Sequence, residues 1–138
     1  MSGEVPIIFR IYEDPNGVLC AYESEKQVPF CIQRIFTVTA NAGDFRGNHA
    51  HRRCSQLLVC LAGKILVNCN NGHEDKEYLL DNMGTGLLVP PGIWAQQNYL
   101  VNNSLLMVLC DRLYEADDYI HSHSQFKSFL MQGIRETL

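Results

Sequence analysis

The chain has 138 residues, a formal net charge of −4 and 46% hydrophobic residues. This length fits one compact domain, residues 1–138, and excludes a second domain of ordinary size. The mild acidity argues against a nucleic-acid partner, which needs a basic face, and no apolar run is long enough to span a membrane.

Short runs rich in β-branched and aromatic residues follow one another from residue 7 to about residue 113. Turn-forming sequences separate them, among them Asp14-Pro15-Asn16-Gly17, Asn70-Asn71-Gly72 and Pro90-Pro91-Gly92. Many short strands with regular turns indicate a sandwich or a barrel. The strands that we expect cover residues 7–12, 18–22, 30–39, 56–61, 64–69, 76–80, 86–89, 94–99 and 104–109.

The C-terminal region has the period of a helix instead. Its apolar residues fall on one helical face, at Phe126, Phe129, Leu130 and Ile134. Asp117-Asp118 and Ser124 lie near its start and could cap or favour it. We therefore predict a C-terminal helix that packs on the β-sheets, with its apolar face against the core or against a second copy of the chain.

Six cysteines are present, and no two of them have the CxxC spacing. Most lie inside apolar runs, such as Cys60 within residues 57–61, so we interpret them as small buried thiols in a reducing compartment. A zinc cluster or a disulfide framework is the less favoured alternative. Because the first residues lack the basic and apolar regions of a signal peptide, we expect a cytoplasmic protein.

Two blocks of the sequence keep the spacing of the cupin motifs. In the first, Gly43 is followed after five residues by His49-Ala50-His51, and Gln56 stands at the position of the motif's glutamate. In the second, Gly84, Pro90 and Gly92 fit, but Ala95 stands where the motif has histidine. The chain therefore resembles the cupins. This resemblance implies an all-β fold, the double-stranded β-helix or jelly roll, to which the C-terminal helix is added.

His49 and His51 are two residues apart on an expected strand, so their side chains point to the same side. Metal-binding cupins complete their site with the glutamate and the later histidine, which are Gln56 and Ala95 here. Two imidazoles and a neutral amide hold a divalent ion poorly, so we predict no metal and no cofactor. Paired imidazoles that titrate near neutrality can act as acid and base instead.

Arg46 lies three residues before His49, which places it on the opposite face of a regular strand. Gly47 could break that regularity and turn Arg46 inward. An inward guanidinium would pair well with a diphosphate or with a developing enolate.

A narrower resemblance rests on several pieces spread over nearly the whole chain. The run from Arg46 to His51, the segments 56–63, 86–94 and 114–120, and Pro29-Phe30 look like the thymidine-diphosphate-sugar 3,4-ketoisomerases, a group of WxcM-like cupins. The resemblance implies a homodimeric, metal-free enzyme that moves the carbonyl of a dTDP-4-keto-6-deoxyhexose from C4 to C3 through an enediol.

The resemblance also implies roles for single residues. His49 and His51 match the acid/base residues of the family, and Arg46 is the expected partner of the enediolate. The predicted substrate-binding residues, which are weaker candidates, are Arg34, Gln56, Asn48, Trp94 and Tyr119. His121 and His123 lie outside both cupin blocks, and we expect them on a solvated surface.

Departures from the family pattern keep other functions open. Phe36 and Thr37 stand where related chains often have tyrosine, and Ala95 replaces a histidine. A 3,5-epimerase acting on the same substrate type, a non-catalytic sugar-binding cupin and a metal-dependent dioxygenase are the alternatives, and Gln56 and Ala95 argue against the last. The sequence does not determine the C4 stereochemistry of the product or the nucleotide.

Overall fold

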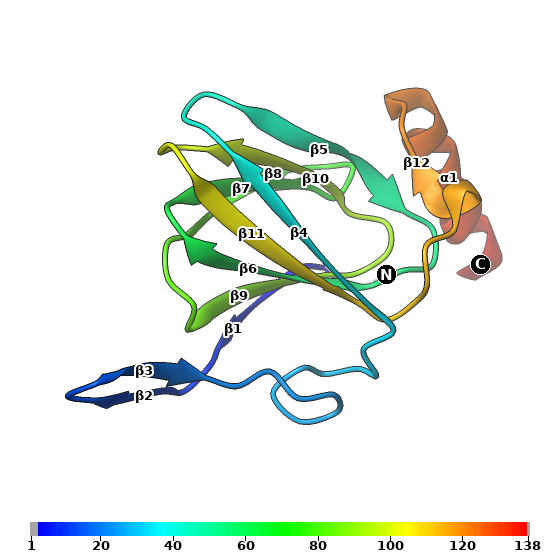
Figure 1. Ribbon diagram of the computed structural model, residues 1–138. Helices are drawn as coiled ribbons and strands as arrows, with labels where there is room; N and C mark the ends of the chain where they lie inside the picture. Colours follow the sequence, from blue (N-terminus) through cyan, green and yellow to red (C-terminus); the bar gives the residue numbers. More distant parts are fainter. Residues whose placement is uncertain (1–2, 138) are drawn as a thin grey trace.

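The computed structural model describes residues 3–137 and consists of two five-stranded sheets, a small hairpin and a C-terminal helix (Figure 1). The first sheet has the order β1-β9-β6-β11-β4, with strands Val5–Ile8, Thr85–Val89, Gln56–Ala62, Ser104–Cys110 and Arg34–Ala40. The second has the order β12-β5-β10-β7-β8, with strands Tyr119–Ile120, Phe45–His51, Trp94–Tyr99, Ile65–Asn70 and Asp75–Leu80. The hairpin pairs β2 (Ile11–Asp14) with β3 (Gly17–Cys20).

The two large sheets face each other across the main core, which draws its side chains from both. Strict alternation places these side chains inward: Leu58 and Cys60 of β6 and Val67 and Cys69 of β7 are all buried there. All named strand pairs are antiparallel. This is the jelly-roll architecture that the cupin spacing predicted.

Two smaller clusters cover the outer faces of the sheets. The N-terminal segment packs on the first sheet, where Phe9 and Val28 meet Leu57 and Leu109. On the second sheet, Phe126 of the helix packs on Ala50, Trp94 and Ile120. Alternate residues of β6 therefore pack in different clusters: the even-numbered ones in the main core and the odd-numbered ones in the cluster on the outer face.

Most predicted strands are present, but the N-terminal one is divided. Residues 7–12 do not form one strand, because Phe9 turns into the core and its N–H donates to the carbonyl of Gly84. Strand β1 ends at Ile8 and β2 begins at Ile11. The prediction for residues 30–39 began too early, since β4 starts at Arg34, and the prediction for 18–22 ran past the end of β3.

The C-terminal helix α1 spans His123–Thr137. Its start is capped by Ser122, whose Oγ accepts a hydrogen bond from the N–H of Gln125 at 3.2 Å. The predicted cap residues are thus wrong: Ser124 lies inside the helix, and Asp118 belongs to a short 3₁₀ turn, η1 (Ala116–Asp118). Among the described residues, no helix combines the length and apolarity needed to cross a bilayer.

Four of the six cysteines, Cys54, Cys60, Cys69 and Cys110, are buried, as we predicted. All six are free thiols.

Candidate active site

The segment before His49 contains a β-bulge. In the pairing of β5 with β10, Ala95 is opposite His49 and Gln96 is opposite Gly47, which leaves Asn48 without a partner. Both bulge residues have positive φ, 86° at Gly47 and 60° at Asn48. A Cβ at Gly47 would lie 3.0 Å from the backbone carbonyl oxygen of Ala95, and the φ of 86° is strained for any residue with a Cβ, so this position favours glycine.

The bulge brings Arg46 to the same face as the histidines. Beyond it, Arg46 is opposite Gln97, and Gln97 lies on the same inward face of β10 as Ala95 and Tyr99, two residues to either side. Burial raises the pKa of Tyr99, while the charge of Arg46 acts to lower that pKa, which agrees with an inward guanidinium. The expectation that Gly47 would break the alternation is confirmed.

His49 and His51 form a close pair with fixed hydrogen bonds. Their ring centroids are 5.0 Å apart and the rings are nearly perpendicular, at 86°. Nδ1 of His49 lies 3.0 Å from the carbonyl oxygen of Gly47, and Nδ1 of His51 lies 2.8 Å from Oδ2 of Asp118. Both partners are acceptors, so each Nδ1 carries the proton and each Nε2 has a free lone pair.

Asp118 is the residue that the sequence analysis missed. It is 2% exposed, and its second oxygen, Oδ1, accepts a hydrogen bond from the backbone N–H of Arg53 at 2.6 Å. Burial acts to raise the pKa of Asp118, but the hydrogen bonds from His51 and Arg53 outweigh it and the pKa is lowered. Asp118 is therefore an ionised carboxylate that fixes the tautomer and the orientation of His51. The only sequence signal was its place beside Tyr119 in the 114–120 piece.

Both imidazoles are neutral at neutral pH. Burial lowers the pKa of His49 to about 4, and the charge of the nearby His51 is the second largest cause of this shift. Burial also lowers the pKa of His51, against the opposing effect of Asp118. Nε2 of His51 is buried and has no hydrogen-bond partner among the described residues. The pair is prepared to accept protons.

Two of the predicted binding residues, Tyr119 and Arg34, lie beside the histidines. The ring centroid of Tyr119 is 4.4 Å from that of His51 and 5.0 Å from that of His49. Nη1 of Arg34 donates to the Tyr119 hydroxyl at 3.4 Å, and its guanidinium lies over the ring of Phe36, 4.5 Å from the centroid. Arg34 and Phe36 are two residues apart on β4 and both point to the core side. Cations and aromatic rings therefore gather around the pair of histidines.

Gln56 also points inward. It is buried, and its Nε2 donates to the sulfur of Cys110 at 3.5 Å. Arg34, Gln56, Arg46, His49, His51 and Tyr119 thus share the inner side of the sheets.

Asn48 and Trp94 lie on the other side of the second sheet, which corrects the prediction that they share the site of the histidines. Trp94 precedes the inward-facing Ala95, so it points outward and packs on Phe126 of α1. Asn48 is the bulged residue and lines the same outer surface as Trp94. Sequence spacing alone did not determine these faces.

His121 and His123 are exposed, as we predicted. The ring of His121 stacks on Tyr119, with centroids 5.7 Å apart and an interplanar angle of 9°, and it lies 6.2 Å from His49. His123 stacks on Trp94 at 4.2 Å. One of the two therefore borders the histidine pair and the other borders the outer surface.

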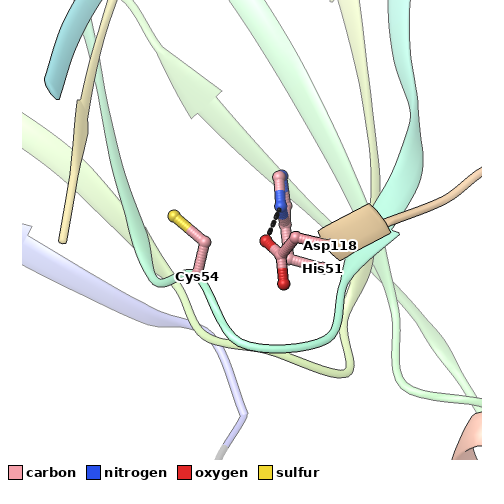
Figure 2. Close-up of side chains that lie close together, drawn as sticks. All are labelled: His51, Cys54 and Asp118. Carbon is pink, nitrogen blue, oxygen red and sulfur yellow. Dashed lines mark hydrogen bonds and ion pairs between the residues drawn. The ribbon is translucent and has the colours of Figure 1, made fainter. Parts of the chain in front are cut away.

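The structure brings together three groups that could hold a metal ion. Nitrogen, sulfur and oxygen atoms of His51, Cys54 and Asp118 all lie within 4.8 Å of one another. Figure 2 shows the carboxylate of Asp118 facing the imidazole, with the thiol of Cys54 to one side. A cation bound by Nδ1 of His51 would have to displace its proton and the hydrogen bond to Asp118. The arrangement suits a hydrogen-bonded pair better than a metal site.

The lowered pKa values predict that acid destabilises the fold. The pKa of His49 is about 4 in the folded chain against 6.5 for an ordinary histidine. Between these values the unfolded chain binds more protons, so the free energy of unfolding falls as the pH drops below about 6.5 and keeps falling towards about 4. We expect the Tm, followed by circular dichroism, to decline over this window, and to decline less in His49→Asn. An equal decline in both proteins would contradict the assignment.

Comparison with known proteins identifies the family. Residues 4–131 match the family described as FdtA: WxcM-like, C-terminal. The TDP-4-oxo-6-deoxy-alpha-D-glucose-3,4-oxoisomerase of Aneurinibacillus thermoaerophilus is 34% identical over 125 residues, 90% of either chain. Two solved structures are similar at 27% identity. QdtA, a sugar 3,4-ketoisomerase from Thermoanaerobacterium thermosaccharolyticum in complex with TDP, has a TM-score of 0.88 over 91% of this chain and 93% of its own. WlaRB, the TDP-quinovose 3,4-ketoisomerase of Campylobacter jejuni, has a TM-score of 0.86 over 91% and 98%.

Since the family match extends over almost the entire sequence and agrees with the fold, the chain belongs to the WxcM-like, C-terminal family of FdtA.

Proposed function

We propose that this protein is a nucleotide-sugar 3,4-ketoisomerase that moves the carbonyl of a dTDP-4-keto-6-deoxyhexose from C4 to C3. The observation that carries the proposal is a pair of neutral imidazoles, one of them held by the buried carboxylate of Asp118. The 3,4-ketoisomerase activity of the similar proteins supports the same reaction.

The reaction needs one proton removed and one returned. Nε2 of His51 takes the proton from C3, a C3–C4 double bond forms, and the electron pair of the C4 carbonyl moves to its oxygen. The proton of the C3 hydroxyl then passes to the C4 oxygen, and C4 takes a proton from the protonated base as the C3 oxygen becomes the new carbonyl oxygen. His49, or the substrate's own hydroxyl, relays protons between these positions.

The positive groups around the histidines suit the charge that develops. Arg46 or Arg34 stabilises the enediolate oxygen, and the second arginine is available to the diphosphate. Tyr119 offers a ring for stacking on the base or the sugar, and Gln56 is a weaker candidate for a sugar hydroxyl. The chemistry uses only acid, base and fixed charge, so we propose that it runs without a metal or another cofactor.

The test is incubation of the pure protein with TDP-4-keto-6-deoxyglucose in deuterated water, followed by NMR of the sugar. We expect the ketone to move to C3 and deuterium to enter at C4, with the same rate after exhaustive treatment with EDTA. Deuterium at C3 and C5 with the ketone still at C4 would indicate a 3,5-epimerase. No exchange at all would indicate a binding protein, and loss of activity with EDTA would contradict the metal-free mechanism.

Arg46→Lys should lower kcat/KM about tenfold, although the charge is kept. An ammonium does not reproduce the planar, bidentate guanidinium at a developing oxyanion. Arg112→Lys is the matched control, because Arg112 is exposed and its guanidinium bonds to Glu115 alone within the part of the chain that the structure describes. Steady-state kinetics of the two variants decide the matter. Equal rates for both would remove Arg46 from the mechanism.

We also propose that the enzyme is a homodimer in which the β2–β3 hairpin takes part. The hairpin projects from the body of the molecule (Figure 1), and Tyr12, Val18 and Leu19 on it are 49%, 48% and 59% exposed. Apolar surface of this kind and unpaired sheet edges favour cover by a second chain.

The six cysteines of the chain are free thiols, which suits the reducing cytoplasm, where we propose that the enzyme works.

Light scattering should give the mass of a dimer, and Leu19→Asp should shift it towards the monomer. Leu79→Asp is the control, because Leu79 is similarly exposed, at 48%, but lies on β8. A monomer at every concentration of the wild-type protein would refute the dimer.

A further inference from the structure

A groove lies on the outer face of the second sheet, on the side away from the histidine pair. It has a volume of about 600 Å³, within the range of small-molecule sites, and is bounded by strands β5, β7 and β10 and by the first turns of α1. Asn68 lies between the core residues Val67 and Cys69, and Gln96 follows the core residue Ala95, so both amides point outward into the groove. The nucleotide-sugar reaction proposed above does not use this groove.

Amide side chains from three adjacent strands form its floor. Asn48 comes from β5, Gln96 from β10 and Asn68 from β7, and Gln96 is directly opposite Asn68 in the sheet. Cross-strand neighbours of this kind have Cβ atoms about 5 Å apart. No hydrogen bond within the described residues occupies these three side chains, whereas Asn70 beside them is held by Asp75 at 2.9 Å. Each free amide offers both a donor and an acceptor.

The remaining walls indicate the kind of ligand. Trp94 and His123 stack at 4.2 Å on the helix side and give the groove an aromatic border. The charges nearly cancel, since Lys127 on α1 faces the groove together with Asp75. A diphosphate or another strong anion would need several cations here. Hydroxyl groups both donate and accept hydrogen bonds, so an array of free amides beside aromatic rings matches a ligand rich in hydroxyls.

We infer that this outer groove binds an uncharged saccharide, at a site separate from the histidine pair. Asn48 and Trp94, which the sequence placed at the nucleotide sugar, line this second site. Saccharide binding in this groove is independent of the ketoisomerase reaction, because His49, His51 and Asp118 do not line it.

The test is NMR of the full-length, ¹⁵N-labelled protein titrated separately with D-fucose and with maltotriose. We expect shifts in the side-chain amide signals of Asn68 and Gln96 and in the indole N–H of Trp94, with no shift at Tyr119. Asn68→Ala and Gln96→Ala should each weaken binding roughly fivefold, as expected for one hydrogen bond. Both variants should keep the wild-type ketoisomerase rate.

Asn98→Ala is the matched control, because Asn98 lies two residues after Gln96 on the same face of β10 but outside the groove. It should leave saccharide binding unchanged. Shifts confined to the histidine side, no shift with either saccharide, or TDP alone shifting the groove signals would each overturn the inference. The ketoisomerase rate is measured separately, so failure of this site and failure of the proposed reaction are distinguishable.

Discussion

His51→Asn should abolish exchange of the C3 proton, with kcat falling about a hundred- to ten-thousandfold, the usual worth of a general base. The side chain of asparagine occupies about the same place as histidine up to Nδ1, and its amide can still donate to Asp118. The fold and the binding of the sugar nucleotide should therefore persist. The measurements are deuterium exchange at C3, steady-state kinetics, and calorimetric binding of TDP. Binding that is kept while exchange is lost separates the chemical role from a structural one.

His73→Asn is the control, since His73 is exposed in the turn between β7 and β8, and strand β10 separates these strands from β5. His49→Asn should also slow the reaction, but less, because the substrate's own hydroxyl can relay a proton. Full exchange and turnover in the double variant of His49 and His51 would disprove the mechanism, whatever the family membership.

Asp118→Asn should lower kcat on the order of a hundredfold, although the carboxylate is buried and we propose that it acts through His51. The amide that replaces the carboxylate can donate to Nδ1 of His51, which moves the imidazole proton to Nε2 and removes the lone pair that accepts the C3 proton. Nitrogen NMR of the His51 ring should report this change of tautomer directly. The loss should appear in kcat while KM stays close to its wild-type value, since Asp118 acts as a positioning residue.

Asp117→Asn is the matched control, because Asp117 is the neighbouring residue, its side chain is 81% exposed, and among the described residues its carboxylate pairs with Arg53 alone. It should leave both kcat and the tautomer unchanged. An Asp118→Asn variant that keeps its rate, or one that loses it while the His51 proton stays on Nδ1, would remove the carboxylate from the proposed role.

The parts of the site that follow local rules were predictable from the sequence. The spacing of His49 and His51 placed both rings on one face, and Gly47 signalled the irregularity that turns Arg46 inward. Asp118 was not predictable in the same way. It lies 67 residues from His51, and a carboxylate near a helix start has a simpler local explanation.

The errors in the fold have similar causes. The run that contains Phe9 has the composition of one continuous strand, and only its long-range bond to Gly84 divides it. Trp94 lies inside the second cupin block, but its direction depends on which neighbour faces the core, and Ala95 takes that place. Period and composition predict elements, whereas the partner across the sheet decides where each one ends and which side it presents.

The bulge at Gly47 and Asn48 changes how distance along this strand should be counted. Because two residues of β5 occupy the space of one, the three-residue interval from Arg46 to His49 equals a two-residue interval in an unbulged strand. A related protein with Arg-x-His at this place, one residue shorter, would present its arginine to the same side. Removal of Asn48 should therefore keep Arg46 on the inner side of the sheet and delete one amide from the outer groove. Deletion of this one residue thus changes the outer face of the sheet and leaves the arginine on the inner face.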